Sequence, residues 1–218
     1  MSADTAEISV VTVPDAGPAT TPIPSLRLLL YPVDAASAAE VLAGRAPRGM
    51  EAAPGYPSRF SLDLMSYAEH GATPGDVGPF FILRRADRAL VGEIGCRVDP
   101  ATGTAHVGYT IAEHCQNLGY ATEALRALLR HLLYDVGVRR VEGETLAGHV
   151  ASRRVMEKAG MRPAGRRKGP GVKGGDVRVS YEAVAGVWRH DLPVLLGRRS
   201  RRRQRHRAAR RGLRLIIS

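Results

Sequence analysis

A run of small and polar residues between an expected strand and a long expected helix is the segment best suited to chemistry. It reads Gln-Asn-Leu-Gly-Tyr-Ala-Thr over residues 116–122. The first backbone N–H groups of a helix have no partner inside the helix, and the helix dipole adds positive charge at the same end. Small residues, here Gly119 and Ala121, let phosphate oxygens approach these amides closely. The segment therefore predicts a phosphate-binding loop that needs no basic side chain.

This loop resembles the signature of a known family. Gln116-x-x-Gly119-x-Ala121 is similar to the Gln/Arg-x-x-Gly-x-Gly/Ala pattern of the GNAT superfamily of N-acetyltransferases. Residues 108–111 (Gly-Tyr-Thr-Ile) and 119–124 (Gly-Tyr-Ala-Thr-Glu-Ala) resemble its ribosomal-protein N-terminal-acetyltransferase-like branch. The strand before the loop and the helix after it are in the register of that family.

A second stretch further along the chain resembles another motif of the same family. His149-x-x-Ser152, followed by Lys-Ala-Gly-Met at residues 158–161, is similar to the family's Asn-x-x-Ser/Ala and Lys-x-Gly-Phe. Two residues depart from the pattern. His149 replaces the usual Asn, and either holds the strand bulge that Asn normally holds or faces solvent. Met156 stands where many members have a Tyr that protonates the leaving thiolate.

The resemblance implies acetyl-CoA as cosubstrate and direct transfer of its acetyl group to a primary amine, on a protein N-terminus or on a small molecule. It further implies that one strand splays from its neighbour, so that backbone groups of this strand meet the thioester and the pantetheine arm. The residues expected to bind acetyl-CoA are Tyr109, Ile111, Ala112, Gln116, Asn117, Leu118, Gly119, Tyr120, Ala121, Thr122, His149 and Ser152.

Proton transfer needs a donor for the CoA thiolate. Because the Met156 side chain has no proton to give, Ser152 is the best remaining donor, as in branch members that use a serine there. The alternative is that Ser152 is simply the N-cap of the helix that follows.

A base must also take the proton of the attacking ammonium group. His106 stands where the branch often carries a Glu, and a histidine with a pKa near neutrality suits this task. A strand histidine exposed to solvent is the alternative. Glu93 and Glu144, on neighbouring strands, are rival bases, and Glu123 is expected to be a charge at a helix N-terminus.

The net charge of +11 suggests a nucleic-acid-binding protein until the charge is located along the chain. Ten arginines lie between Arg198 and Arg214, so residues 1–197 carry a net charge of only +1. The tail permits weak attraction to nucleic acid or ribosomes, and a solvated tail without a role is the alternative. Cys96 and Cys115 have no second Cys or His at metal-ligand spacing, so no metal is expected.

The hydrophobic pattern predicts one α/β domain of the mixed α+β kind, a GNAT-like, mostly antiparallel sheet flanked by helices. The expected strands are residues 26–33, 80–85, 89–98, 106–112, 138–146, 161–168 and 177–187. The expected helices are residues 35–43, 59–69, 121–136 and 151–159. Residues 1–24 are expected to be a disordered leader, 25–197 the acetyltransferase domain and 198–218 a disordered Arg-rich tail.

No stretch is apolar and long enough to span a membrane, and the N-terminus lacks the pattern of a signal peptide, which predicts a cytoplasmic protein. We expect a monomer or homodimer. Two other functions stay open: a CoA-binding regulatory module without turnover, suggested by His149 and Met156, and a nucleic-acid-associated protein that acts through its tail.

Overall fold

The computed structural model of the chain describes residues 21–70, 76–99, 101–168 and 177–189. The tail predicted for residues 198–218 and most of the predicted leader lie outside these ranges. Ile23 and Pro24 form a short edge strand, so the sheet begins within the stretch assigned to the leader.

The N-terminal part contributes one edge of the sheet and two helices. Its elements are β1 (Ile23–Pro24), β2 (Leu28–Pro32), α1 (Ala35–Leu42), β3 (Glu51–Ala52) and α2 (Arg59–Glu69). Helix α1 begins where the sequence predicts, because the Asp34 side chain accepts a hydrogen bond of 2.7 Å from the Ser37 amide. This N-cap satisfies one of the amides that the first turn leaves unpaired.

The remaining elements complete a nine-stranded sheet. They are β4 (Asp76–Arg84), β5 (Ala89–Asp99), β6 (Thr104–Ile111), η1 (Glu113–Cys115), α3 (Tyr120–Arg130), η2 (His131–Val136), β7 (Arg140–Leu146), α4 (Val150–Lys158), β8 (Arg162–Lys168) and β9 (Val177–Val184). The strand order is β1-β2-β4-β5-β6-β7-β9-β8, with β3 beside β5. The predicted mixed, mostly antiparallel sheet is confirmed, because only the β3–β5 and β6–β7 pairs among the described strands are parallel.

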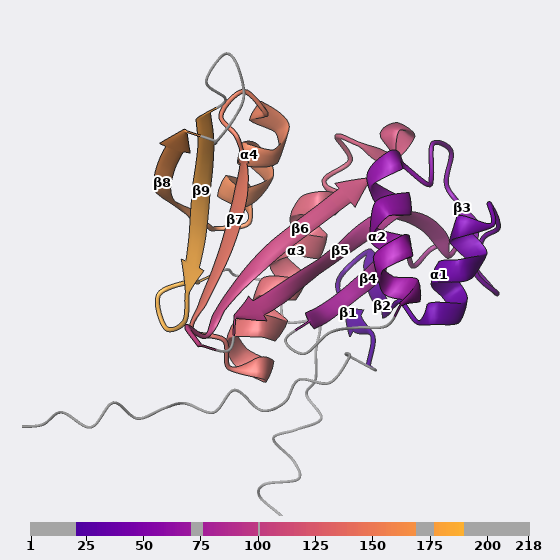
Figure 1. Cartoon of the computed structure of the whole chain (residues 1–218), viewed down its shortest axis with the longest axis horizontal. Coiled ribbons are helices and arrows are strands. Elements are labelled where there is room, and N and C mark those ends of the chain that lie inside the picture. Colours follow the sequence, from indigo (N-terminus) through magenta and orange to yellow (C-terminus); the bar gives the residue numbers. More distant parts are fainter. Residues whose placement is uncertain (1–20, 71–75, 100, 169–176, 190–218) are drawn as a thin grey trace, which may run out of the picture.

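Helices cover both faces of the sheet (Figure 1). Helices α1 and α2 pack on one face, over a small core that includes Phe81, Leu83 and Leu90. Helices α3 and α4 pack on the other face, over a larger core that includes Phe80 and Ile94. Alternate residues of a strand therefore reach different cores, as the pleat of a strand requires.

The sheet splits between β6 and β7. These parallel strands pair only from Thr104 to Val107 on β6 and from Arg140 to Gly143 on β7. Beyond this point β7 pairs with β9 and β6 with β5, so the two halves of the molecule diverge toward the upper side of Figure 1. This is the splayed centre that the resemblance implied.

A bulge in β5 decides which way its only buried carboxylate points. The β4–β5 register shifts between Ile82 and Leu83, so that Glu93 lies opposite Phe81 and shares its face of the sheet. Without this extra residue, the alternation from Val91 would send Glu93 into the α3 core. Gly92 is required here, because a Cβ at this position would lie 2.1 Å from the Thr110 carbonyl oxygen of β6.

Candidate active site

The predicted phosphate-binding loop joins η1 to α3 at the open end of the split. Gly119 is the residue before α3 and has a left-handed backbone, with φ of 82°, and no side chain caps this helix end. Asn117 is also left-handed, with φ of 61°. No described side chain therefore caps the amides of the first turn of α3, which leaves them open to a ligand. Together with the dipole of α3, they can hold phosphate oxygens.

A cluster of three residues, Ser25, Arg27 and Glu123, ties this loop to the β1–β2 turn. The Glu123 carboxylate accepts hydrogen bonds from the Ser25 hydroxyl at 2.7 Å, the Arg27 amide at 2.6 Å and Arg27 Nε at 2.7 Å. Arg27 Nη1 also donates to the Leu118 carbonyl at 3.1 Å, and its guanidinium lies 4.8 Å above the centre of the Tyr120 ring. One guanidinium thus contacts the last part of the loop and the first residue of α3.

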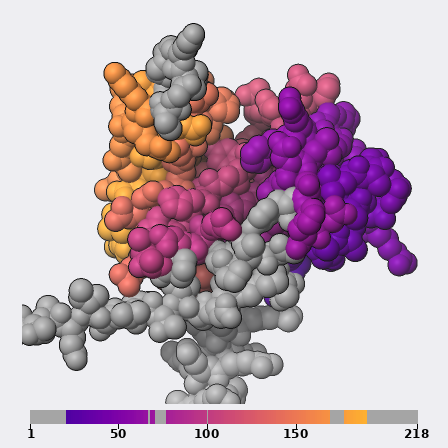
Figure 2. Space-filling model, viewed as in Figure 1, coloured from indigo at the N-terminus to yellow at the C-terminus, as the bar shows by residue number. Residues whose placement is uncertain are grey.

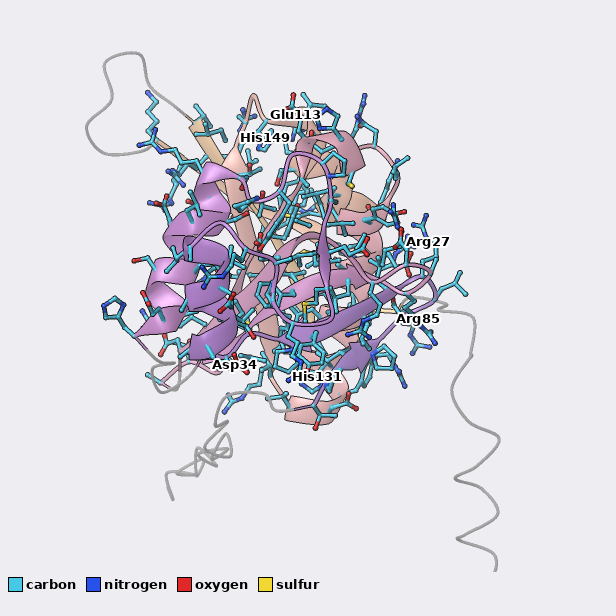
Figure 3. All side chains as sticks on the ribbon, turned by 90° about the vertical axis from the view of Figure 1, so that its right-hand side faces the viewer. Arg27, Asp34, Arg85, Glu113, His131 and His149 are labelled. Carbon is cyan, nitrogen blue, oxygen red and sulfur yellow. The ribbon has the colours of Figure 1, made fainter. Side chains whose placement is uncertain are left out.

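Hydrogen bonds outweigh burial in setting the pKa of Glu123. Partial burial alone would raise the pKa of Glu123, but the hydrogen bonds from Arg27 and Ser25 outweigh it and hold that pKa below its usual value. Arg27 and Arg85 lie at the same edge of the molecule (Figure 3), where Arg85 donates to the Ser25 carbonyl at 3.0 Å. Sequence reasoning missed this cluster, because nothing in the spacing connects Glu123 with a turn so far away in the chain.

The backbone of β6 faces the split. The Ala112 amide donates to Val91 on β5 at 2.9 Å. Because hydrogen-bonding direction alternates along a strand, the backbone groups of Tyr109 and Ile111 point away from β5, into the opening. The Ile111 carbonyl accordingly accepts a bond of 3.2 Å from Gln116 Nε2 of the loop. The split is visible as a hollow between the two halves of the molecule in Figure 2.

On the α4 side of β6, two hydroxyl groups meet. The Tyr109 hydroxyl lies 3.1 Å from Ser152 Oγ and donates to the Ser152 carbonyl, also at 3.1 Å. Burial raises the pKa of Tyr109, which keeps the phenol protonated at neutral pH. The sequence analysis assigned Tyr109 only a backbone role, so the contribution of its side chain to this pair is new.

Ser152 is not an N-cap, and that interpretation is wrong. Helix α4 begins at Val150, His149 is the residue before it, and Ser152 lies within the first helical turn. Its hydroxyl is therefore available for other partners. Met156, on the next turn, is buried in the core beside Gly143, where a Cβ would lie 2.7 Å from its Sδ atom. The methionine fills the space that a side chain at position 143 would need.

On the α2 side, Glu93 is fully buried. Its Oε2 accepts a hydrogen bond of 3.0 Å from the Ser61 hydroxyl, which in turn lies 2.9 Å from the Ser58 hydroxyl. Burial raises the pKa of Glu93 to about 7, although the neighbouring hydroxyl groups of Tyr56 and Ser61 lower it in part. Burial and the charge of Glu93 also raise the pKa of Tyr56.

This carboxylate has unused hydrogen-bonding capacity. Glu93 Oε1 and the Tyr56 hydroxyl are both buried, and neither has a hydrogen-bond partner among the described residues. An unsatisfied buried carboxylate oxygen is costly and is commonly found where a ligand or water completes the site. A carboxyl that titrates near neutrality suits a general base.

The other two predicted bases, His106 and Glu144, are exposed and lie beside charged side chains. His106 lies on the paired part of β6, opposite Glu142, and its side chain is 61% exposed. Its Nδ1 lies 3.8 Å from the Glu142 carboxylate. Glu144 binds Arg167 at 2.7 Å and Arg178 at 3.1 Å, and these bonds lower its pKa, which makes it a weaker base.

His149 lies at the turn between β7 and α4, at the end of the molecule where Glu113 also lies (Figure 3). Its Nδ1 is 3.3 Å from the Thr145 hydroxyl of β7, and its amide donates to the Leu146 carbonyl at 2.9 Å. The side chain is exposed yet helps to hold the turn. The exposed side chain agrees with the solvent-facing interpretation, and its ring contacts the turn and not a bulge in β7.

The described residues lack two other kinds of feature. Within these ranges, no three His, Cys, Asp or Glu side chains lie close enough together to hold a metal ion. None of the helices described is both long and apolar enough to cross a membrane.

Comparison with known proteins agrees with this geometry. Residues 27–162 match the model of the acetyltransferase (GNAT) domain. Over 86 residues, 39% of this chain, the sequence is 30% identical to the uncharacterized N-acetyltransferase YnaD of Bacillus subtilis. The chain spans about half the length of that relative, 51%.

Solved structures share the fold. A GCN5-related N-acetyltransferase from Brucella melitensis superposes with a TM-score of 0.59 at 22% identity, covering 79% of this chain and 82% of that one. The ribosomal alpha-N-protein acetyltransferase RimL, solved in complex with coenzyme A, superposes with a TM-score of 0.57 at 17% identity, covering 76% of this chain and 98% of RimL. At these identities the likeness shows the fold alone.

Proposed function

We propose, on the premise that the chain belongs to the family of GNAT acetyltransferase domains, that it transfers the acetyl group of acetyl-CoA to a primary amine. The observation that carries this proposal is the split between β6 and β7, which opens beside the loop before α3. Two sets of proton-carrying side chains flank the strand that forms one wall of the split.

The residues of the split fit acetyl-CoA. The amides of the first turn of α3 and the left-handed Gly119 suit the pyrophosphate, and the outward-facing backbone groups of Tyr109 and Ile111 suit the amides of the pantetheine arm. Acetyl-CoA supplies the activated thioester. The chain orients that thioester and manages the protons.

Glu93 takes the proton from the attacking amine. As the nitrogen bonds to the thioester carbon it becomes positively charged, and loss of its proton leaves a neutral amide. Glu93 is fully buried, so the proton reaches it through an intervening water or the Ser61 hydroxyl, which lies 3.0 Å from the carboxylate. With a pKa of about 7, Glu93 is largely ionised at slightly alkaline pH and can accept the proton.

Ser152 gives a proton to the sulfur as the C–S bond breaks. Its hydroxyl lies 3.1 Å from the hydroxyl of Tyr109, which can replace the proton that Ser152 loses. The proton demand is modest, because a thiolate is already a good leaving group. Positioning is therefore expected to contribute more to the rate than this acid does.

The acceptor amine belongs to a protein N-terminus or to a small molecule. The likeness to RimL supports a protein N-terminus, and supports it only through the shared fold. The cytoplasmic location and the state of assembly stay predictions, and the nucleic-acid role of the tail concerns residues outside the described ranges.

Turnover tests the proposal. The purified chain is incubated with acetyl-CoA and a panel of peptides and small amines, and free CoA thiol is measured against a control without amine. We expect amine-dependent release of CoA together with an acetylated product of matching mass. If calorimetry shows acetyl-CoA binding but no amine accelerates CoA release, the chain is a CoA-binding module and the proposal is wrong.

A further inference from the structure

A cavity of about 250 Å³ lies on the α2 face of the sheet, opposite the face that carries α3 and α4. It is formed between the first turns of α2 and the strands β4, β5 and β6. The residues that line it are Phe60, Leu64, Gly78, Pro79, Gly95, Cys96, Arg97 and Gly108.

This cavity adjoins the reaction centre proposed above. Gly108 directly follows Val107, the last residue of β6 that pairs with β7, and a Cβ on Gly108 would meet nothing within 4 Å. Gly95 lies opposite Gly108 on β5. Glu93 is the next residue of β5 on the same face, about 7 Å away at the usual rise of a strand.

The walls of the cavity are mainly apolar. Phe60 and Leu64 come from α2, and Phe60 is 51% exposed although it is a large aromatic side chain. Three glycines and a proline give the opposite walls little but backbone and aliphatic surface. No Asp or Glu is among the described residues that line the cavity, and the one charged residue among them is a cation, Arg97.

The walls of the cavity favour an apolar group over a charged one. Burying apolar surface against Phe60 and Leu64 is favourable in proportion to its area. Burying a second ammonium group there would cost its hydration without a carboxylate to replace it. The volume is slightly below that of pockets for drug-sized ligands, which limits the occupant to a compact group.

We infer that this cavity holds the part of the acceptor molecule to which the amine is attached. The acceptor is then a primary amine on a compact apolar group, not a polycation. This inference rests on the proposed function. The same chemistry occurs in a free arylalkyl or alkyl amine and in a peptide whose first side chain is apolar. The acceptor nitrogen then lies between the cavity and the split, on the side of β6 where Glu93 is buried.

An acceptor panel tests the inference and separates the two sources. Phenethylamine represents the free amine, a Phe-Ala-Ala peptide the N-terminus, and spermidine the polycation, each compared by kcat/KM at saturating acetyl-CoA. We expect one or both apolar acceptors to exceed spermidine by at least about 10-fold, as the burial of one ring predicts. Equal or better use of spermidine overturns the inference while leaving acetyl transfer itself intact.

Two variants on α2 locate the effect. Leu64→Trp fills the cavity and should lower kcat/KM for the preferred apolar acceptor by at least about 10-fold. Leu62→Ala is the matched control, because Leu62 is 38% exposed on the same helix and is not among the lining residues. Affinity for acetyl-CoA, measured by calorimetry, should stay unchanged in both and shows that each variant is folded.

Three further results would overturn the inference. An unchanged kcat/KM in Leu64→Trp, with acetyl-CoA bound normally, places the acceptor elsewhere and overturns the inference. If Leu64→Trp does not fold, Leu64→Ala, which enlarges the cavity, must instead raise the preference for a bulkier apolar amine over phenethylamine by several-fold, and no such change overturns it. Absence of turnover with every amine contradicts the proposed function and, with it, the inference.

Discussion

The polar groups on the two sides of β6 differ in charge. On the α2 side, a single carboxylate is fully buried with one oxygen unsatisfied, and burial raises its pKa to about 7. On the α4 side, the hydroxyls of Tyr109 and Ser152 contact each other at 3.1 Å and carry no charge. The buried carboxylate is the more costly feature, since a charge loses far more hydration than a hydroxyl does.

This difference in charge suits two different proton transfers, one from the amine and one to the thiolate. A base must hold the proton of an ammonium group near neutral pH, which requires a carboxyl with a raised pKa and hence burial. An acid that assists a thiolate needs only a hydroxyl within reach. We therefore expect the chemistry to depend strongly on the α2 side and weakly on the α4 side.

The largest effect is expected on the α2 side. Glu93→Gln keeps the shape of the side chain but cannot accept a proton, so kcat/KM should fall by roughly 10²- to 10⁴-fold. Acetyl-CoA affinity, measured by calorimetry, should change little. Full activity in this variant would remove Glu93 from the mechanism.

The same variant should be more stable than the wild type at alkaline pH. The folded protein releases the Glu93 proton near pH 7 and the unfolded chain near the ordinary pKa of 4.5, so wild-type stability falls as pH rises between these values. Above pH 7 this loss of wild-type stability is about 3 kcal/mol, and below pH 4.5 it vanishes. Urea unfolding of both proteins at the two ends of this window measures it, and a constant difference would contradict the raised pKa.

The next effect concerns the loop that both sides share. Gly119→Val puts a branched side chain at a left-handed residue with φ of 82°, 3.4 Å from Arg27 at its Cβ. Acetyl-CoA binding should weaken by at least about 2 kcal/mol, roughly 30-fold in Kd. Calorimetry checks this, and an unchanged Kd would show that the pyrophosphate binds elsewhere.

A smaller effect is expected on the α4 side. Ser152→Ala should lower kcat by roughly 10- to 100-fold, with little change in acetyl-CoA affinity. Ser152→Thr is the matched control, because it retains the hydroxyl and should retain most of the rate. A full kcat in the alanine variant would end the role of Ser152 and assign the proton to Tyr109 or water.

The smallest effect is expected at the cluster of Ser25, Arg27 and Glu123. Glu123→Gln removes the charge that holds Arg27, which should weaken acetyl-CoA binding by about 1 kcal/mol, roughly 5-fold in Kd. The kcat at saturating acetyl-CoA should be kept, because the cluster acts on the loop and not on the reacting atoms. A loss of kcat with unchanged Kd would show that the cluster acts in another way.

The sequence predicts what is local in the chain. The N-cap at Asp34, the helix at residues 59–69 and the left-handed end of the helical stretch at Gly137 follow from short-range patterns, and the structure has all three. The loop around Gly119 is likewise a contiguous motif. Family resemblance added the split between β6 and β7, which no periodicity reveals.

What the sequence does not predict arises from contacts between distant segments. The face on which Glu93 lies depends on a bulge against β4, and its burial depends on α2. Sequence position left His106, Glu93 and Glu144 unranked as bases, and the structure places His106 on the paired and exposed part of its strand. The hydroxyl pair of Tyr109 and Ser152 requires α4 to pack across the opening, which register alone cannot show.

The pH dependence of kcat/KM tests the assignment of the base most directly. The acceptor should be an amine whose own pKa lies well below 7, so that only the protein titrates in the range of interest. The account predicts that wild-type kcat/KM rises with pH through an apparent pKa of about 7, the pKa of buried Glu93, and that Glu93→Gln lacks this rise. The same rise in both proteins would contradict the account and assign the proton to another group.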